Sequence, residues 1–414
     1  MRNRSSTRGS RSRSSRRARL AIDQATTNRP AIDRPSPDSF PSTLLVQKIA
    51  PPEVSIVIPA RNEEVNIGDC LKSLTSQRGV RFEIIVVDDA STDRTREIAQ
   101  SFASVRVIST WLYLYASKSL PGARWTGKNI ALFVGARSAS APWILFTDAD
   151  TIHLPGSVAR ALAEAKNEDA DLLSYSPEQI VATFAERAVM PVVFAELAAQ
   201  YPPHKVRDPH SGIVAANGQY ILVRRAVYEA VGGHAAVASE ILEDVALARR
   251  FRDAGKKIFF RYGGDAVRTR MYRNWPQLRE GWTKNLALLF PNPGVLAAKA
   301  MIAWLASWAA LLVAAVGLAT HHQVWLLLAA RWPLLYRRIH TAHFAVSNNL
   351  CAIAVGMPMF AYLLLRSKRA HARGQVEWKG RSYQVEVKSK SEPPRTRPAT
   401  HMPPLAPPKL RTDN

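Results

Sequence analysis

Two aspartates separated by one residue, Asp148 and Asp150, can converge on one divalent cation. They follow the apolar run WILFT at 143–147, which is typical of a buried β-strand. Carboxylate oxygens suit Mg²⁺ or Mn²⁺, and these cations usually bridge to substrate phosphates. Burying two neighbouring carboxylates without a cation is costly because like charges repel. The pair therefore predicts a cation site, and the alternative is a solvated turn.

A second acidic pair, Asp88 and Asp89, closes the apolar run EIIVV at 83–87. A carboxylate exposed at that point can accept hydrogen bonds from a nucleotide base or a ribose. The alternative is an Asx turn, in which the aspartate caps the helix that follows.

A third acidic pair, Glu243 and Asp244, precedes the apolar positions of ILEDVALARRF, so we expect it at the start of a helix. A carboxylate there can act as a general base that takes a proton from an acceptor hydroxyl. The alternative is a structural role, because a helix dipole favours negative charge at its N-terminus.

Two segments rich in small residues accompany these acids. Lys128 follows PGARWTG and opens an apolar helix, and a helix N-terminus with Gly and Lys can hold phosphate. The spacing differs from that of a P-loop, which disfavours a nucleoside triphosphatase. The second segment contains Gly233 and His234, where a substrate could approach the backbone closely. His234 could serve as a base, but the interpretation we favour is a structural loop histidine.

The elements that must position these residues alternate between strands and helices over residues 53–290. Apolar patterns predict strands at 54–58, 83–87, 105–108 and 143–147, and helices at 63–76 and 91–103. Ser91 or Thr92 is available to cap the second helix. This alternation predicts an α/β fold with a mainly parallel sheet, whose ligands bind beyond the carboxyl ends of the strands. The pairs at 88–89 and 148–150 both fall there.

The motifs then form a recognisable series. In chain order they read IVIPARNEE, VVDDASTD, WTGKNIAL, FTDAD, NGQYILVRR, GGH and LEDVALARR. The series resembles the inverting glycosyltransferases of family 2 over residues 53–290. The resemblance implies the GT-A fold, a Rossmann-like nucleotide-diphospho-sugar transferase architecture with a mainly parallel sheet flanked by helices.

The resemblance also implies how the donor nucleotide is bound. Pro59, Arg61 and Glu63 would line the nucleotide pocket. Asp89 would contact the uracil, with Asp88 beside it. The expected donor is a nucleotide-sugar, and specifically a UDP-sugar.

Further roles concern the reaction itself. Asp148 would lie at the ribose and the metal, and Asp150 would ligate Mg²⁺ or Mn²⁺ bridging the diphosphate. Lys128 would lie near the phosphates and, with the cation, stabilise the departing UDP. Asp244 would be the catalytic base, supported by Glu243. Attack from the opposite face would invert the anomeric centre.

Features after Glu243 and Asp244 indicate which type of family 2 glycosyltransferase the chain resembles. The run GWTKNLALLF, the apolar C-terminal segments and VEWKGRSY resemble membrane glycosyltransferases of the hopanoid- and carotenoid-associated type. Processive polysaccharide synthases of the family carry QxxRW after the base, whereas this chain has Gln277 and Trp282 at a different spacing and no Arg directly before the Trp. That departure favours transfer of a single sugar. Trp282 could stack on a sugar or acceptor, or anchor the membrane interface.

Three apolar segments follow the predicted catalytic region, at 300–319, 324–336 and 342–365. The first has no charge over twenty residues, which is long enough to span a bilayer. The second contains Arg331 and could lie in the interface, so two or three crossings are open, and a buried helical core is the alternative. The basic residues from 366 place that end in the cytoplasm. With the catalytic domain also cytoplasmic, we expect two crossings of the cell (inner) membrane.

Charge is concentrated in the two ends of the chain. The formal net charge is +23, of which residues 1–20 and 366–414 carry +8 each. A basic tail suits anionic lipid or nucleic acid, and the alternative is a solvated tail. The first segment also resembles a transit peptide in composition, and a misassigned start codon is a further alternative. Two cysteines, Cys70 and Cys351, exclude a disulfide scaffold and a cysteine-based zinc site.

These features predict four regions. They are a disordered basic tail at 1–50, a GT-A domain at 51–290, transmembrane or interfacial helices at 291–368, and a basic Pro-rich tail at 369–414. The function expected is transfer of a single sugar to a hydroxyl of a lipid acceptor at a membrane. The alternatives are a polysaccharide synthase, an oligosaccharide-assembling transferase, and a basic membrane scaffold with a degenerate site. Nucleic-acid binding is disfavoured because the tails lack interleaved aromatic residues.

Overall fold

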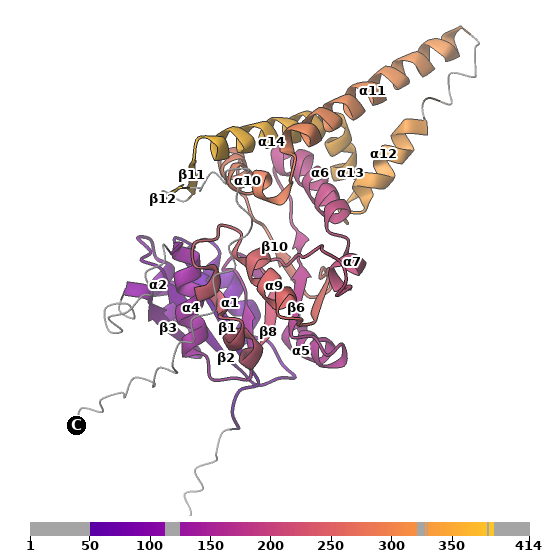
Figure 1. The fold of residues 1–414 in the computed structure, drawn as a ribbon. Coiled ribbons are helices and arrows are strands. Elements are labelled where there is room, and N and C mark those ends of the chain that lie inside the picture. The colour runs from indigo at the N-terminus through magenta and orange to yellow at the C-terminus, as the bar shows by residue number, and fades with distance from the viewer. Residues whose placement is uncertain (1–49, 112–124, 321–327, 329, 379–380, 385–414) are drawn as a thin grey trace, which may run out of the picture. The chain divides into compact units, whose positions relative to one another are not determined.

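The computed structural model describes residues 50–111, 125–320, 328, 330–378 and 381–384 (Figure 1). Both predicted tails lie outside these residues for most of their length. So do residues 121–124 before Lys128, the beginning of the apolar segment at 324–336, and residues 379–380 of VEWKGRSY.

A seven-stranded sheet forms the centre of the catalytic region, in the order β3-β2-β1-β4-β8-β6-β9. Its strands are β1 (Val54–Ala60), β2 (Phe82–Asp88), β3 (Val105–Ser109), β4 (Trp143–Phe146), β6 (Leu172–Ser176), β8 (Ile221–Arg224) and β9 (Ile258–Tyr262). The pairs β1–β2, β2–β3, β1–β4 and β6–β9 are parallel, and β8 runs antiparallel to both its neighbours. The prediction of a mainly parallel sheet is confirmed.

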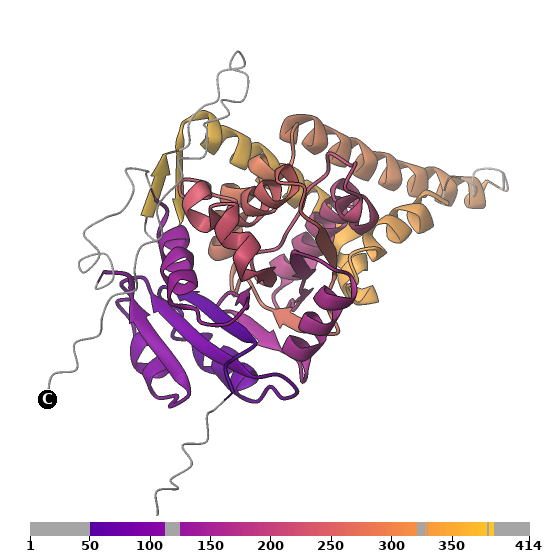
Figure 2. The same cartoon turned by 60° about the horizontal axis from the view of Figure 1, so that its bottom comes forward.

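Smaller sheets and helices complete the fold (Figures 1 and 2). β5 (Thr151–His153), β10 (Val267–Thr269) and β7 (Glu178–Gln179) form a three-stranded sheet, and β11 (Gln375–Trp378) pairs with β12 (Arg381–Gln384). The helices around the large sheet are α1 (Ile67–Thr75), α2 (Thr95–Gln100), α4 (Gly127–Ser138), α5 (Ser157–Asn167), α7 (Pro203–Arg207), α8 (Arg225–Ala230) and α9 (Glu243–Asp253). The remaining long helices are α6 (Phe184–Gln200), α10 (Trp275–Leu289), α11 (Pro293–Ala319), α12 (Arg331–His340), α13 (Val346–Cys351) and α14 (Met357–Ala372).

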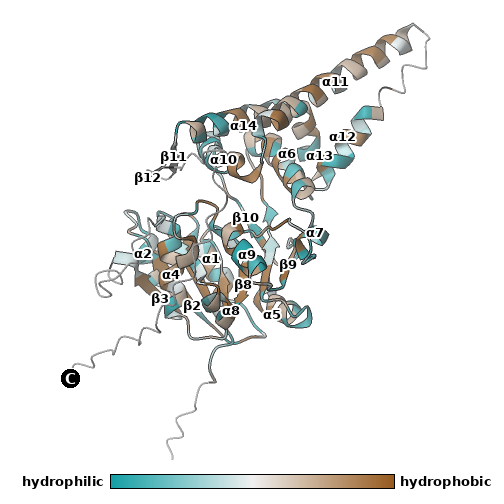
Figure 3. Cartoon of the chain, viewed as in Figure 1, coloured by the Kyte–Doolittle hydropathy of each residue, from teal (hydrophilic) through white to brown (hydrophobic). Residues whose placement is uncertain are grey.

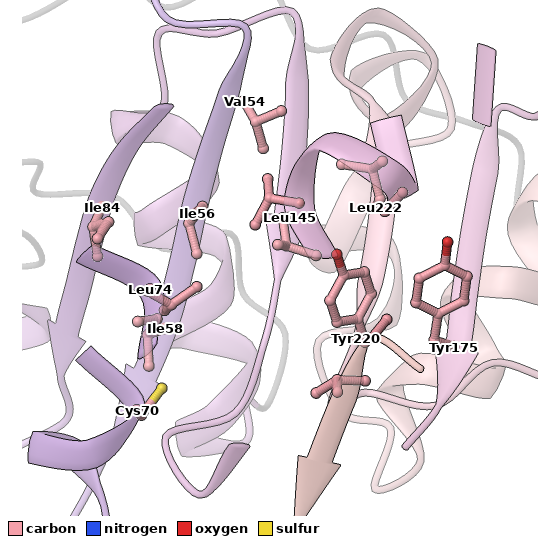
Figure 4. Packing of buried hydrophobic residues seen from close by; sticks show 14 of the residues in the cluster. Val54, Ile56, Ile58, Cys70, Leu74, Ile84, Leu145, Tyr175, Tyr220 and Leu222 are labelled. Carbon is pink, nitrogen blue, oxygen red and sulfur yellow. The ribbon is translucent and has the colours of Figure 1, made fainter. Parts of the chain in front are cut away.

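Both faces of the large sheet are covered, which explains why its central strands are continuously apolar. Val54, Ile56 and Ile58 of β1 pack on one face, in a cluster with α1 and α5 (Figure 4). Val57 points to the other face and packs against α4. Because successive strand residues alternate between faces, one run of five residues serves two cores.

The predicted helices at 63–76 and 91–103 are both shorter than expected. Asn62 has a φ of +52°, and the chain turns before α1 begins at Ile67. The capping prediction for α2 is wrong, because the helix begins at Thr95 and Asp93 Oδ1 accepts the Thr95 N–H at 3.0 Å. Ser91 instead accepts the Asn62 N–H at 3.1 Å, so it joins two loops.

A third core lies between α6, α10, α14 and their neighbours. Gly356, in the π-helical segment Ala352–Gly356 that precedes α14, packs directly on α6. A Cβ at Gly356 would lie 2.0 Å from the Ala188 carbonyl oxygen, so no larger residue fits. This contact fixes the C-terminal helices against a helix of the catalytic region.

Within the described residues, two helices are long and apolar enough to cross a membrane, by length and composition only: Pro293–Ala319 and Val346–Ala372. In Figure 3, α11 is largely brown and pale, whereas α12 between them is largely teal. α11 is the more exposed, with 22% of its most apolar window buried against 50% for the second helix. The predicted span at 300–319 falls within the first of these helices, and the predicted span at 342–365 overlaps the second from Val346 onward.

Candidate active site

A cavity of about 910 Å³ opens at the carboxyl ends of β1, β2 and β4. Most of the residues singled out from the sequence line it: Pro59, Arg61, Glu63, Asp89, Lys128, Asp148, Asp150, Glu243, Asp244 and Trp282. Asp88, Gly233 and His234 do not. Residues as distant in the sequence as Pro59 and Trp282 thus meet in one space, which has the size of a small-molecule site.

One end of the cavity is built from the loops after β1 and β2. Arg61 donates from Nη1 to the Asp89 carbonyl at 2.7 Å, and Thr110 donates to Asp89 Oδ1 at 3.4 Å. Asn62 and Ala90 both have positive φ, +52° and +54°. Left-handed backbone at two non-glycine residues is strained, and such strain gathers at binding sites.

Asp88 has the structural role that the sequence left open. It is buried, and its Oδ1 accepts the Ser91 N–H at 3.1 Å, which closes an Asx-type turn. Its neighbour Asp89 faces the cavity instead. The two adjacent carboxylates therefore have different surroundings. Asp88 shapes the loop, and Asp89 lines the cavity.

A buried polar network supports the turn that carries Asp148 and Asp150. Thr147 donates to the Gln219 carbonyl at 2.8 Å, and Thr151 donates to the Asp148 carbonyl at 2.7 Å. His153 Nε2 lies 3.1 Å from the Thr147 hydroxyl. Burial lowers the pKa of His153 to about 3, so the ring stays neutral.

The Lys128 ammonium connects the Asp148–Asp150 pair with the Glu243–Asp244 pair. Its Nζ lies 2.9 Å from Asp148 Oδ1 and 2.7 Å from Glu243 Oε1. Burial works against the charge on Lys128, but Asp148 and Glu243 outweigh it and hold the lysine pKa well above its usual value. Lys128 opens α4, and the Thr126 hydroxyl caps that helix by accepting the Asn129 N–H at 3.2 Å.

Asp244 has the electrostatics of a base that works near neutral pH. Burial, and then the neighbouring Glu243 carboxylate, raise the pKa of Asp244 to about 6. Gly218 donates its N–H to Asp244 Oδ2 at 2.8 Å. A Cβ at Gly218 would lie within 3.4 Å of Lys128 Nζ, Glu243 Oε1 and Asp244 Oδ2, so the glycine keeps the centre of the cluster open.

The pKa of Glu243 moves in the opposite direction. Burial favours its protonated form, but Lys128 and then Lys284 prevail and lower its pKa. The preceding loop is held by the buried amide of Asn129, which donates to the carbonyls of Val237 at 2.8 Å and Ala238 at 3.0 Å. Asn129 of the WTGKN motif therefore sets the position of the acidic pair.

Gly233 and His234 pack away from the cavity lining. The His234 ring is buried against Phe146, its Nδ1 lies 2.8 Å from the Tyr228 hydroxyl, and burial lowers its pKa to about 3. A Cβ at Gly233 would lie 2.5 Å from the Tyr228 ring. These contacts agree with a structural loop histidine, and no acceptor role is assigned to either residue.

The other end of the cavity is apolar and helical. Phe194, Leu197 and Tyr201 come from α6 and its C-terminus, and Trp282 and Leu289 come from α10. Trp282 is 2% exposed and packs edge-on against Phe194, with ring centroids 6.2 Å apart. Tyr201 donates its hydroxyl to the Leu289 carbonyl at 2.6 Å, which joins the two helices.

Sequence reasoning missed two cations of this helical end. Lys284 of α10 lines the cavity, and it lay unassigned within the quoted run GWTKNLALLF. Arg270 also lines it and forms two hydrogen bonds of 3.1 Å with Glu186 at the start of α6. The signal for Lys284 was a charge within an apolar helix, which alone does not distinguish a site from a surface.

The residues fit one divalent cation only if a ligand helps to hold it. Within the described residues, no group of three or more His, Cys, Asp and Glu side chains is arranged to hold a metal. Asp148 and Asp150 both line the cavity, and burial raises the pKa of Asp148. A diphosphate that entered this carboxylate-rich site would need positive charge beyond Lys128, and hard oxygen ligands suit Mg²⁺ or Mn²⁺.

Comparison with known proteins identifies the domain. Residues 55–232 match the family model described as "Glycosyl transferase family 2". The chain therefore contains a stretch that is similar to the glycosyltransferases of family 2. Its central sheet, with helices on both faces, is of the GT-A type that the sequence motifs implied.

Relatives and solved structures extend the comparison. The chain is 28% identical over 349 residues to a 4,4'-diaponeurosporenoate glycosyltransferase of Staphylococcus aureus strain USA300, covering 80% of this chain and 88% of that protein. A mannosyltransferase from Pyrobaculum calidifontis, in complex with GDP-Man and Mn²⁺, aligns with a TM-score of 0.41 at 18% identity, covering 78% and 87% of the two chains. Glucosyl-3-phosphoglycerate synthase from Mycobacterium tuberculosis, in complex with Mn²⁺ and UDP-glucose, aligns with a TM-score of 0.38 at 22% identity, covering 57% and 79%.

Proposed function

We propose that this glycosyltransferase moves a single sugar from a nucleoside diphosphate sugar, a UDP-sugar in the first instance, to a lipid-like acceptor at a membrane. The observation that carries the proposal is the cavity, which is polar and charged at its sheet end and is lined at its helical end by apolar residues together with Lys284 and Arg270. A nucleotide-sugar suits the charged end, and an apolar acceptor suits the helical end.

The charged end supports a nucleotide donor. Asp89 faces the cavity beside Arg61, where hydrogen bonds to a base are available. Asp148, Asp150 and Lys128 lie further along, where the diphosphate would be held with Mg²⁺ or Mn²⁺. The cation, when bound, neutralises charge that develops on the departing diphosphate.

The apolar end supports a lipid-like acceptor. Phe194, Leu197 and Trp282 offer carbon surface rather than hydrogen bonds, and binding there would gain from removing apolar area from water. The relative in Staphylococcus aureus is named for an acceptor, 4,4'-diaponeurosporenoate, and it matches most of this chain. The acceptor end adjoins α14, which belongs to one of the two candidate membrane helices.

The reaction that this arrangement suits is an inverting displacement. Asp244 takes the proton of an acceptor hydroxyl, whose oxygen attacks the anomeric carbon while the bond to the diphosphate breaks. Lys128 keeps Glu243 ionised, and that negative charge raises the basicity of Asp244. An acceptor that attacks through a carboxylate would need no base.

The membrane proposal rests on α11 and on the Val346–Ala372 helix. Two crossings of the cell membrane would put both the catalytic domain and the residues after Arg366 in the cytoplasm. The absence of a QxxRW motif supports single-sugar transfer, because Gly281 rather than Arg directly precedes Trp282 and Gln277 lies five residues before the Trp instead of four.

The test is a transfer assay with labelled nucleotide-sugars and membrane lipid extracts, using wild type and Asp244→Asn. We expect a labelled lipid product from wild type, and a rate about 10²- to 10⁴-fold lower for the variant with unchanged nucleotide affinity. A variant that keeps near wild-type rates would mean that the acceptor attacks as an anion or that the base lies elsewhere. A wild type that labels only soluble polymer would contradict the lipid acceptor.

A further inference from the structure

α10 presents two different faces along its length. Leu278 and Leu286 are buried in the core shared with α6 and α14, and Trp282 belongs both to that core and to the cavity lining. Gln277 and Lys284, seven residues apart and therefore on one side of a helix, line the cavity. α10 thus places the Lys284 side chain at the cavity while its apolar residues pack on the C-terminal helices.

Lys284 belongs to the same group of charges as the predicted catalytic acids. Burial lowers its pKa, while Glu243, Asp244 and Asp148 favour its charged form and Lys128 opposes it. Two lysines therefore approach one acidic cluster from different elements, Lys128 from α4 and Lys284 from α10. Lys128 is held by Asp148 and Glu243, at 2.9 and 2.7 Å.

A buried serine of α14 holds the turn of α10 that carries Lys284. Ser367 is fully buried, donates its hydroxyl to the Thr283 carbonyl at 2.7 Å, and accepts the Ala287 N–H at 2.9 Å. In a regular α-helix, those two backbone groups are the hydrogen-bonding partners i and i+4. Ser367 therefore contacts both ends of the single helical turn that contains Lys284.

A second residue of α14 strengthens this hold. His371 lies one turn after Ser367, and its Nε2 is 2.9 Å from the carbonyl oxygen of Lys284 itself. Because a carbonyl oxygen only accepts, Nε2 carries the proton in this contact. Arg366 adds a hydrogen bond of 3.2 Å to the Thr283 hydroxyl.

We propose that Lys284 is a further catalytic residue, which binds the diphosphate of the departing nucleotide, and that Ser367 is the positioning residue that aims it. This inference rests on the proposed function. As the sugar–oxygen bond breaks, its electron pair stays on the terminal phosphate, and the acceptor proton passes to Asp244. The Lys284 ammonium donates hydrogen bonds to the phosphate oxygens and remains protonated throughout. α14, which is the C-terminal part of a candidate membrane helix, is thereby linked to the leaving group through Ser367 and Lys284.

The experiment measures kcat and KM for donor and acceptor in the full-length protein. The variants are Lys284→Ala, Ser367→Ala, Ser367→Thr and the double variant Lys284→Ala/Ser367→Ala. The matched control is Ser307→Ala, which removes another buried serine hydroxyl from a candidate membrane helix. Ser307 donates to the Ala303 carbonyl of its own helix, and no hydrogen bond in the described residues joins it to α10.

We expect Lys284→Ala to lower kcat about 100-fold and Ser367→Ala about 10-fold, with donor KM changed less than threefold, because the contact strengthens as charge develops. Ser367→Thr should restore most of the rate. In the Lys284→Ala background, Ser367→Ala should cost nothing further, since it acts through that lysine. Independent losses in the double variant, or equal losses in Ser367→Ala and Ser307→Ala, would overturn the positioning role.

A binding measurement separates this inference from the proposed function. UDP and UMP are titrated into wild type and Lys284→Ala with Mn²⁺ present. We expect the variant to bind UDP about tenfold more weakly and UMP equally well. Equal UDP affinities, or no UDP binding by folded wild type, would overturn the role of Lys284. A wild type that binds UDP with this lysine dependence but glycosylates no lipid would contradict only the proposed acceptor.

Discussion

The two walls of the cavity are built in different ways. The donor wall, which carries Asp89, Asp148 and Asp150, consists of short turns at the ends of parallel strands. The helical wall, which carries Phe194, Trp282 and Lys284, consists of α6 and α10 held by the C-terminal helices. The donor wall is thus encoded locally, next to the strands that hold it, whereas the helical wall depends on contacts between residues about 80 positions apart, such as Ser367 with Thr283.

Lys128 links the donor wall to the acidic pair at the start of α9, so its substitution should have the largest effect. Lys128→Met removes the cation between Asp148 and Glu243 and leaves two neighbouring carboxylates to repel a diphosphate. We expect kcat/KM for the donor to fall about 10³-fold. Lys72→Met, which removes an exposed lysine paired with Asp69, is the control for loss of a positive charge. A loss below tenfold would mean that Lys128 is structural.

The pH dependence should come from the acidic pair on α9. The pKa of Asp244 is raised to about 6, so kcat/KM should fall tenfold per unit as the pH drops below that value and this carboxylate becomes protonated. Because Lys128 lowers the pKa of Asp244, Lys128→Met should move this acidic limb to higher pH. Rate profiles of both proteins between pH 4.5 and 8.5 test this. A limb that stays in place would assign the titration to another group.

The donor wall could be predicted from the sequence because its acidic residues directly follow the strands that position them. Apolar runs ending in Asp89 and in Asp148–Asp150 predicted where the sheet would place these carboxylates, and they line one cavity. The predicted start of α2 was wrong because Ser91 accepts a hydrogen bond from the backbone of Asn62, a residue 29 positions earlier in the sequence. Lys284 was missed because a lysine in an apolar helix becomes informative only when the neighbouring helices are placed. The network of Thr147, Thr151 and His153 was missed for the same reason.

Substitution of an apolar residue in the helical wall should affect the acceptor alone. Phe194→Ala removes a half-buried ring from the apolar end of the cavity. We expect acceptor KM to rise about tenfold and donor KM to stay within twofold. Phe184→Ala, at the exposed start of the same helix, is the matched control and should change neither. A rise in donor KM instead would mean that the donor extends into the apolar end.

The smallest effects are expected for substitution of the two adjacent aspartates after β2, which should differ in what they change. Asp88→Ala loses the turn-closing bond to the Ser91 N–H, so we expect a loss of about 1 kcal/mol in the free energy of unfolding and little change in UDP affinity. Asp89→Ala should weaken UDP binding about tenfold and cost less stability than Asp88→Ala, because the contacts of its carboxylate with the Thr110 hydroxyl at 3.4 Å and Arg61 Nη1 at 3.9 Å are long. Denaturant unfolding and UDP titration of both variants provide the comparison. The reverse pattern would exchange the two roles.

The most direct test of the account is calorimetric titration of UDP into detergent-solubilised protein, with and without Mn²⁺, for wild type and Asp150→Ala. The account predicts that Mn²⁺ tightens UDP binding to wild type and that this enhancement is lost in the variant. If folded wild type binds no UDP, or if Asp150→Ala retains the full Mn²⁺ dependence, the proposed donor site is contradicted.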